Sequence, residues 1–242
     1  MIKKYLRIMI KKFLKNLGYQ VTKINNTNYN MKDGIKRCRK RGIEIRTVID
    51  VGASNGCWTK LCMEFYTNSY YYLIEAQKAH EHSLNVFKNL NSNLDYTIKA
   101  AGNRIGEIYF DDSDLFGGLA SDKPLKNCIK IPVTTIDYEV DKNNLNPPFL
   151  IKLDTHGFEV PILEGAKQVL KDSNLVIIEA YNFRLTENSL KFYELCIYME
   201  TLGFYPIDIV DLMSRKKDPS LWQMDIFFIK KERSEFYSNS YD

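Results

Sequence analysis

Short runs of apolar residues recur along the chain from residue 47 onward, separated by polar or glycine-containing segments, as buried strands are. Several are followed by stretches whose apolar residues are spaced three and four apart, as on one face of a helix. Alternating strands and helices predict an α/β fold, with a mostly parallel sheet and helices on both faces. The expected strands are 47–52, 70–76, 96–102, 148–155, 174–181, 204–210 and 223–231, and the expected helices are 56–66, 78–90, 158–171 and 187–202.

One region departs from this alternation. Between residues 106 and 137, GEIYFDD and KIPVTTID have the pattern of two strands, and Gly117 and Gly118 lie in a turn between them. Strands joined without a helix pair antiparallel. We therefore expect an antiparallel insertion after the third strand of the sheet.

The N-terminal segment has a different character. Residues 1–41 carry a net charge of +12, whereas the remainder carries −8. Within residues 1–17 the apolar positions form one helical stripe, and lysines and arginine fill the other face. Such a helix can pack on the domain, or it can lie on an anionic membrane surface. We expect a basic amphipathic helical extension over 1–41 and one catalytic domain over 42–242.

Composition argues against several classes of protein: membrane-spanning, secreted and nucleic-acid-binding. No apolar run approaches the roughly 18 residues that a membrane-spanning helix needs. The N-terminus lacks the unbroken apolar stretch of a secretory signal. The cysteines number five, an odd count without a CxxC pair, which favours a reducing cytoplasm over a disulfide framework. The net basic charge is confined to the extension, so we expect a small-molecule substrate and no nucleic acid.

The stretch VIDVGASNG (48–56) carries the first chemical signal. A buried strand ends near Asp50, and a loop with Gly52 and Gly56 leads into a helix, whose first amides can hold an anionic group. Glu75 closes the next strand, where a carboxylate can accept hydrogen bonds from both hydroxyls of a ribose. Together they are the ingredients of an adenosine-binding unit at the carboxyl edge of a sheet.

Two cofactor classes fit this unit. A dinucleotide fold usually shows G-x-G-x-x-G, but the two glycines here are spaced G-x-x-x-G. The acid Asp50 directly before the loop suits a cofactor with an ammonium group better than a pyrophosphate. S-adenosylmethionine has such a group, and we expect it to be the cofactor.

The sequence resembles the FkbM-type S-adenosylmethionine-dependent methyltransferases, most of which act on oxygen. The resemblance extends from about residue 47 to residue 231 and is most specific at 151–166. It implies a class I methyltransferase fold, Rossmann-like, with a mostly parallel seven-stranded sheet. The motifs that carry it are VIDVGASNG (48–56), LIEA (73–76), GGLAS (117–121), IKLDTHGFEVPILEGA (151–166), IIEA (177–180) and MDIFFIK (224–230).

The same resemblance implies which residues hold the cofactor. The loop after the first strand would hold the methionine portion, and Glu75 would hold the ribose. Ala101 would lie near the adenine, where this chain lacks the acid or amide that many methyltransferases carry, so that backbone atoms or Asn103 would serve instead. The implied cofactor residues are Asp50, Gly52, Ala53, Ser54, Asn55, Gly56, Glu75, Ala76, Gln77 and Ala101.

A second group of residues marks the expected reacting centre. Asp154 follows the fourth strand, where it would lie beside the cofactor or cap the next helix. His156 stands where related sequences carry Gln or Glu, and imidazole is the natural base near neutral pH. Glu179 closes a further buried strand. These three are the predicted catalytic residues, and although they could bind a divalent cation, no metal is predicted.

The resemblance implies an O-methyltransferase that acts on a hydroxyl of a sugar or nucleotide-sugar, in surface-polysaccharide or natural-product biosynthesis. We expect it in the cytoplasm, with peripheral membrane contact through residues 1–17 left open. The alternatives are a methyltransferase for a phosphorylated, phosphoramidate or nitrogen acceptor, or a dinucleotide-dependent oxidoreductase.

Overall fold

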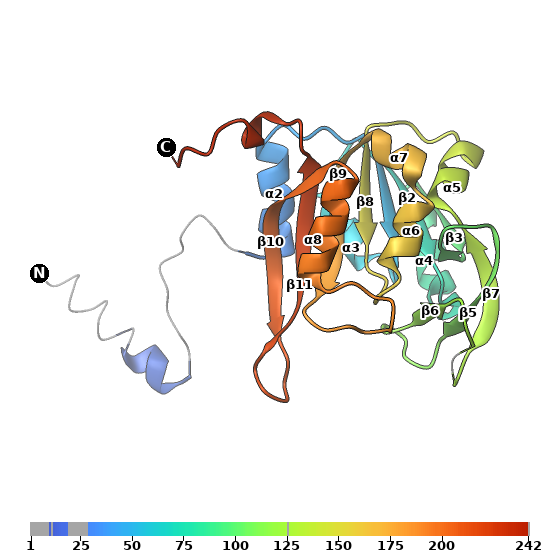
Figure 1. Ribbon diagram of the computed structural model, residues 1–242, viewed down its shortest axis with the longest axis horizontal. Helices are drawn as coiled ribbons and strands as arrows, with labels where there is room; N and C mark the ends of the chain where they lie inside the picture. The colour runs from blue at the N-terminus through green and yellow to red at the C-terminus, as the bar shows by residue number, and fades with distance from the viewer. Residues whose placement is uncertain (1–9, 11, 19–28, 125, 242) are drawn as a thin grey trace, which may run out of the picture.

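A seven-stranded sheet runs through the computed structural model, which describes residues 10, 12–18, 29–124 and 126–241 (Figure 1). The strand order is β10-β11-β9-β8-β1-β2-β3. The strands from β9 to β3 are parallel, and β11 pairs antiparallel with both β9 and β10, so the predicted mostly parallel sheet is confirmed. The strands are β1 (Thr47–Val51), β2 (Tyr70–Glu75), β3 (Leu94–Ile98), β8 (Phe149–Leu153), β9 (Ser173–Tyr181), β10 (Phe204–Ser214) and β11 (Leu221–Lys230).

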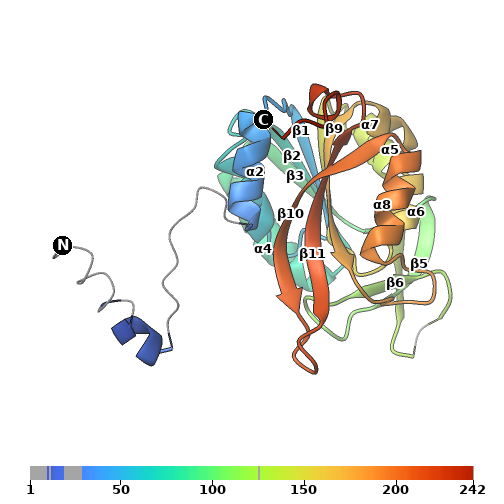
Figure 2. The same cartoon turned by 60° about the vertical axis from the view of Figure 1, so that its left-hand side comes forward.

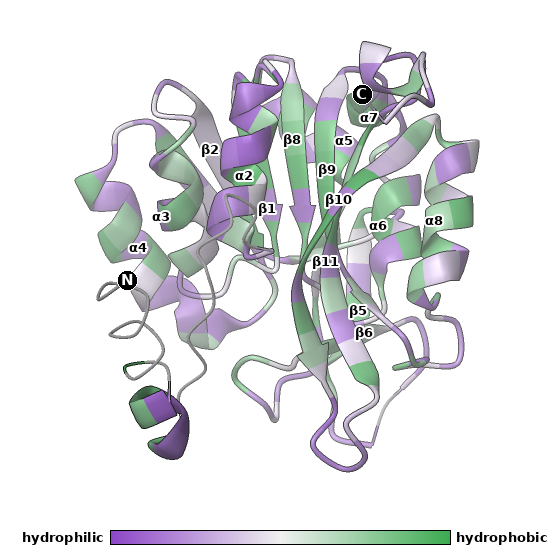
Figure 3. Cartoon of the chain, turned by 90° about the vertical axis from the view of Figure 1, so that its left-hand side faces the viewer, coloured by the Kyte–Doolittle hydropathy of each residue, from purple (hydrophilic) through white to green (hydrophobic). Residues whose placement is uncertain are grey.

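Helices cover both faces of this sheet. All residues of β1 and β8 are buried, as expected for central parallel strands, and β8 and β9 are mostly hydrophobic (Figure 3). One core cluster joins the sheet to α2, α3 and α4, and the other joins it to α5 through α8. The helices are α2 (Met31–Lys40), α3 (Cys57–Met63), α4 (Glu81–Leu90), α5 (Ile136–Lys142), α6 (Glu159–Glu164), α7 (Lys167–Lys171) and α8 (Phe192–Thr201), with short 3₁₀ turns η1 (Lys78–His80) and η2 (Ser234–Phe236).

The predicted antiparallel insertion forms a second, four-stranded sheet in the order β4-β7-β5-β6. Two of its strands, β5 and β6, are labelled in Figure 2. β5 pairs antiparallel with both β6 and β7. The expected third strand, 96–102, is in fact divided, because β4 leaves the main sheet and pairs with β7. The strands of this second sheet are β4 (Ala100–Ala101), β5 (Gly106–Asp111), β6 (Leu119–Ser121) and β7 (Ile129–Thr134).

The expected helix over 158–171 is also divided, into α6 and α7. A Cβ on Gly165 would lie 2.0 Å from the carbonyl oxygen of Gly102, so only glycine permits this close approach of the two backbones. The Asp137 carboxylate accepts from the amides of Gln168 and Val169 at the start of α7. Tertiary contacts thus replace the continuous helix that local spacing predicts.

Helix α2 lies in the segment assigned above to the N-terminal extension, 1–41, but it belongs to the domain. Ile35 and Cys38 are fully buried in a core cluster, and Arg37 donates to the Asp208 carboxylate on β10 at 2.5 and 3.0 Å. The domain therefore begins before residue 31. Most of the predicted amphipathic helix, residues 1–9 and 11, lies outside the described residues.

Replacing Ile35 with alanine tests whether α2 is part of the core. We expect Ile35→Ala to lower the free energy of unfolding by about 2–5 kcal/mol, because it leaves a cavity against the sheet. The neighbouring exposed Lys36 provides the matched control, and Lys36→Ala should change little. Urea unfolding measures both, and equal stabilities for the two variants would show that α2 is not part of the domain.

Candidate active site

The glycine loop after β1 contacts the end of β8. Gly52 has a φ of 77°, and a Cβ there would lie 2.0 Å from the carbonyl oxygen of Asp154. Its amide donates to Ile74 on β2 at 2.9 Å, and the Asp154 amide donates to Val51 at 3.0 Å. Glycine is thus required at position 52, and it brings the loop against the predicted reacting centre.

Asp50 lies behind this loop. It is 1% exposed, accepts a hydrogen bond from the Thr59 hydroxyl of α3 at 2.5 Å, and does not line the cavity described below. Burial raises the pKa of Asp50 to about 7, against the opposing effects of Thr59 and Lys152. The structure therefore places Asp50 where it fixes α3 to β1 and not at a ligand-facing surface.

Glu75 ends β2 and is 6% exposed. Its carboxylate accepts from the Ser54 amide at 2.6 Å and from the Gln77 amide at 2.7 Å, so it ties the glycine loop to the segment after β2. Burial raises the pKa of this carboxyl, and the two amides oppose the rise. Glu75 also lines the cavity, as its position at the carboxyl edge predicts.

A cavity of about 300 Å³ opens at this edge of the sheet, at the lower end of the range of small-molecule sites. It extends from the end of β2, past the insertion, to the loop after β8. Of the predicted cofactor residues, Gly52, Ser54, Glu75, Ala76, Gln77 and Ala101 line it, whereas Asp50, Ala53, Asn55 and Gly56 do not. Asn103 does not line it either and donates to Glu164.

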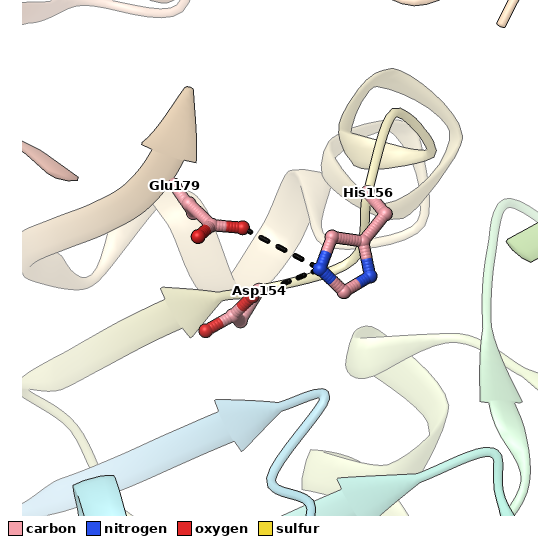
Figure 4. Close-up of side chains that lie close together, drawn as sticks. All are labelled: Asp154, His156 and Glu179. Atoms are coloured by element: carbon pink, nitrogen blue, oxygen red, sulfur yellow. Dashed lines mark ion pairs between the residues drawn. The ribbon is translucent and has the colours of Figure 1, made fainter. Parts of the chain in front are cut away.

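The three predicted catalytic residues meet in this cavity (Figure 4). The Nε2 atom of His156 lies 3.8 Å from Oδ1 of Asp154 and 3.7 Å from Oε2 of Glu179. His156 adopts a φ of 51°, which is uncommon outside glycine, and Gly157 follows at 98°. This backbone turn directs the ring toward both carboxyl groups. Asp154 does not cap α6, whose N-cap residue is Phe158.

Donors hold Glu179 in place. The Tyr181 hydroxyl donates to Oε2 at 2.5 Å, and the Gln223 side-chain amide donates to Oε1 at 2.5 Å. Burial raises the pKa of Glu179 to about 8, and the adjacent Asp154 raises it further. At neutral pH Glu179 therefore retains its proton and contributes a neutral carboxyl to the site.

A buried lysine beneath this group was missed by sequence reasoning. Lys152 on β8 has a side chain 2% exposed, and its Nζ lies 3.1 Å from Asp225 and 3.4 Å from Asp154. Burial favours a higher pKa for Asp154, but Lys152, the hydrogen bond with Glu179 and the nearby His156 together outweigh burial and lower that pKa. Asp154 is therefore ionised. The signal in the sequence was a lysine inside an otherwise apolar strand, which needs a buried partner.

Sequence reasoning assigned no residue of the predicted helix at 78–90 to the site, but the structure places one in the cavity lining. His80 is only 5% exposed and lines the cavity. Its Nε2 lies 2.8 Å from the carbonyl oxygen of Leu115 in the insertion. Sequence reasoning could not find this contact because the two segments meet only in the folded chain.

Among the described residues, Asp154, His156 and Glu179 also form a group that could hold a metal ion, with one ligand atom from each lying within 4.8 Å of the others. Oxygen and imidazole ligands of this kind suit Mg²⁺ or Mn²⁺. Lys152 is itself a cation beside Asp154, so the chain already supplies part of the balancing charge.

Solved structures of similar fold include fibrillarin, a pre-rRNA processing protein from Methanococcus jannaschii, at 14% identity and a TM-score of 0.50, with 78% of this chain and 67% of that one covered. A SAM-dependent methyltransferase from Aquifex aeolicus matches at 14% identity and a TM-score of 0.44, covering 84% and 90%. TYW2 from M. jannaschii, in complex with AdoMet, matches at 15% identity and a TM-score of 0.41, covering 81% and 75%. At these identities the likeness to fibrillarin shows the fold alone.

A comparison with curated proteins finds no match. The methyltransferase FkbM domain model matches residues 50–206, which is more than half of the chain and contains the glycine loop, Glu75 and the three predicted catalytic residues. The chain therefore belongs to the FkbM methyltransferase family, for which the sequence resemblance implies S-adenosylmethionine as the methyl donor.

Proposed function

We propose that the protein transfers a methyl group to a hydroxyl of a sugar or nucleotide-sugar, in the biosynthesis of a surface polysaccharide or natural product. The observation that supports this most is the convergence of Asp154, His156 and Glu179 at one point of the cavity (Figure 4). An oxygen atom above these three polar atoms would reach all of them at about 2.8 Å. The group therefore has the geometry to bind and deprotonate a single hydroxyl.

The rest of the cavity fits the cofactor. Glu75 is a nearly buried carboxyl at the cavity wall, where the two hydroxyls of a ribose can donate to it. Gly52 and Ser54 bring backbone between Glu75 and Asp154, where the methionine portion would lie. The ionised Asp154 complements a sulfonium and an ammonium group. S-adenosylmethionine supplies the electrophilic methyl group when it is bound.

In this proposal His156 accepts the proton of the acceptor hydroxyl as its oxygen attacks the methyl group. The ionised Asp154 stabilises the imidazolium that forms, and the neutral Glu179 helps to orient the hydroxyl. Methyl transfer needs little more than in-line placement and proton removal, which positioned residues provide.

The same charges bear on the alternative acceptors. A phosphorylated or phosphoramidate group at the reacting centre would meet the ionised Asp154, and the nearby Lys152 is already paired with two carboxylates. A neutral hydroxyl avoids this repulsion, and carboxyl groups bind sugar hydroxyls well. A nitrogen acceptor could use the same base. The oxidoreductase alternative is wrong, because the chain belongs to a methyltransferase family.

A screen of nucleotide-sugars with S-adenosylmethionine tests the acceptor class directly. We expect one of them to gain the mass of one methyl group in an enzyme-dependent reaction. Methylation confined to phosphorylated, phosphoramidate or amine acceptors would contradict the proposal.

The catalytic assignment predicts a specific pattern of kinetic loss. We expect His156→Ala and Asp154→Asn to lower kcat by about 10²–10⁴-fold, because proton removal is lost or weakened. The affinity of His156→Ala for S-adenosylhomocysteine should change less than about threefold, since the imidazole is not assigned to hold the cofactor. The exposed His82 provides a matched control, and His82→Ala should be as active as the parent. Parental kcat in both cavity variants would refute the assignment.

The raised pKa of Glu179 predicts how the free energy of unfolding depends on pH. Its pKa is raised from 4.5 to about 8 in the folded protein, so between these values the folded state holds a proton that the unfolded chain has released. Stability from this group is therefore full below pH 4.5 and is lost as pH rises toward 8. Between pH 5 and pH 8, we expect the free energy of unfolding of the parent to fall by about 1–3 kcal/mol more than that of Glu179→Gln, as measured by urea unfolding. Equal losses in both proteins would contradict the assigned protonation state.

We also propose that residues 1–17 bind an anionic membrane surface. No helix in the described part of the chain is long and apolar enough to cross a bilayer. Ile10, Phe13 and Leu17 belong to the apolar stripe of the extension, and they are 48%, 65% and 57% exposed. Lysines flank this stripe in the sequence, as in helices that lie in the interface of anionic membranes.

Vesicle sedimentation tests the membrane proposal. We expect the parent to sediment with phosphatidylglycerol vesicles but not with phosphatidylcholine vesicles, and Phe13→Glu/Leu17→Glu to remain in solution while keeping the parental turnover of a soluble substrate. Tyr237→Glu, at a site 75% exposed elsewhere, serves as the control and should sediment like the parent. Equal sedimentation of the double variant would place membrane binding elsewhere or exclude it.

A further inference from the structure

The insertion contributes an apolar wall to the cavity that nothing in the site described so far uses. Leu115 and Phe116 line the cavity, yet they are 47% and 62% exposed. Both come from the loop between β5 and β6, residues 112–118. Large apolar side chains at the rim of a cavity lose contact with water when a ligand with an apolar face binds against them.

Two polar residues hold this loop over the cavity, and both follow Glu75 closely in the sequence. The Gln77 side-chain amide donates to the carbonyl oxygen of Asp114 at 3.0 Å. The Nε2 atom of His80 lies 2.8 Å from the carbonyl oxygen of Leu115. A carbonyl can only accept, so His80 carries its proton on Nε2 in this contact. The wall is thus fixed relative to the carboxyl that we assign to the ribose.

The loop itself is built to present Phe116. The Asp114 carboxylate accepts from the Phe116 amide at 3.0 Å, which closes a tight turn. A Cβ on Gly118 would lie 2.3 Å from the Phe110 ring, so glycine is needed where the loop rejoins the insertion. The ring of His80 packs against that of Phe116 with centroids 5.5 Å apart.

The chemistry of this end of the cavity indicates the ligand group. Ala100 and Ala101 offer only methyl groups and backbone, and the Phe110 ring adds a further apolar surface. Lys99, a cation that lines this end, is paired with the buried Glu139 at 2.9 Å. The walls therefore suit a flat heteroaromatic ring that is bound by stacking and backbone contacts. Ala100 and Ala101 of β4 provide no acid or amide side chain for its edge.

We propose that the 112–118 loop is the adenine-binding wall of the cofactor site, with Phe116 packed on the base and His80 as the positioning residue that holds the loop. The proposal rests on the cofactor site assigned above. It also accounts for the absence, noted in the sequence, of an acid or amide after the third strand: the insertion supplies aromatic surface in place of a side chain that reads the base edge.

Calorimetric titration with S-adenosylhomocysteine tests the role of Phe116. Base–aromatic stacking predicts that Phe116→Ala weakens binding by about 5- to 150-fold, whereas Phe116→Tyr stays close to the parent. Tyr237→Ala, which removes an exposed aromatic ring far from the cavity lining, is the matched control and should bind like the parent. Because Phe116 is exposed, its loss should not unfold the protein, and circular dichroism checks this.

A second ligand locates the contact. 5′-Methylthioadenosine keeps the adenine and ribose but lacks the amino acid portion, so Phe116→Ala should weaken its binding by the same factor. A loss seen only with S-adenosylhomocysteine would place Phe116 at the amino acid portion and overturn the proposal. Binding within twofold of the parent for both ligands would also overturn it. If the parent binds neither ligand, the cofactor site itself is wrong.

The role of His80 has its own measurement. We expect His80→Ala to weaken the binding of S-adenosylhomocysteine by about 2- to 13-fold, the range of one net hydrogen bond. The same variant should exchange the amide hydrogens of residues 112–118 faster in the ligand-free protein. His80→Gln keeps an N–H donor and should restore much of the affinity. Unchanged exchange in the loop of His80→Ala would show that this histidine does not hold it.

Discussion

The close approach of Gly52 to Asp154 is the constraint on which the site depends. β1 and β8 are adjacent parallel strands, with Asp50 opposite Lys152 in their register, so their carboxyl ends meet at one edge of the sheet. A side chain at position 52 would collide with the Asp154 carbonyl at 2.0 Å. Because position 52 has no side chain, the glycine loop packs directly against the loop that carries Asp154 and His156, and both loops line the same cavity. A cofactor held by the first loop therefore has its reactive end beside the second.

The second requirement is charge balance beneath that wall. Lys152 is buried in a central strand, within 3.1 Å of Asp225 and 3.4 Å of Asp154. Removing charged groups from water costs several kcal/mol per ion, and a buried carboxylate needs a partner to remain ionised. Lys152 lets Asp154 keep its charge, while Glu179 meets the same burial by keeping its proton. The site thus presents one anionic and one neutral carboxyl to His156.

Local sequence patterns were sufficient for much of this architecture. Apolar runs ending in Asp50, Glu75 and Glu179 predicted the parallel strands and the edge at which their acids lie, because strand direction places carboxyl ends together. Asp154, His156 and Glu179 were predicted to lie at this edge for the same reason, and their side chains do meet in the cavity. What local patterns could not show were contacts between distant segments. His80 meets the insertion only after folding, and its helical segment gives no sign of burial.

The differences between the expected and the observed positions have the same origin. The boundary at residue 41 followed the change in charge along the chain, but α2 buries an apolar face while its basic residues stay outside, so charge and packing divide the chain at different points. Asp50 was assigned to the cofactor because it precedes the glycine loop. In the fold its carboxylate bonds to Thr59 of the next helix, which a strand-and-loop pattern does not reveal.

The claim common to all of this is that one cavity joins the ribose-binding carboxyl at Glu75 to the catalytic group around His156. A crystal structure of the complex with S-adenosylhomocysteine tests it most directly. The account predicts ribose hydroxyls on Glu75 and the thioether sulfur in the part of the cavity between Gly52 and His156. A ligand bound outside this cavity, or with its sulfur directed away from His156, would contradict it.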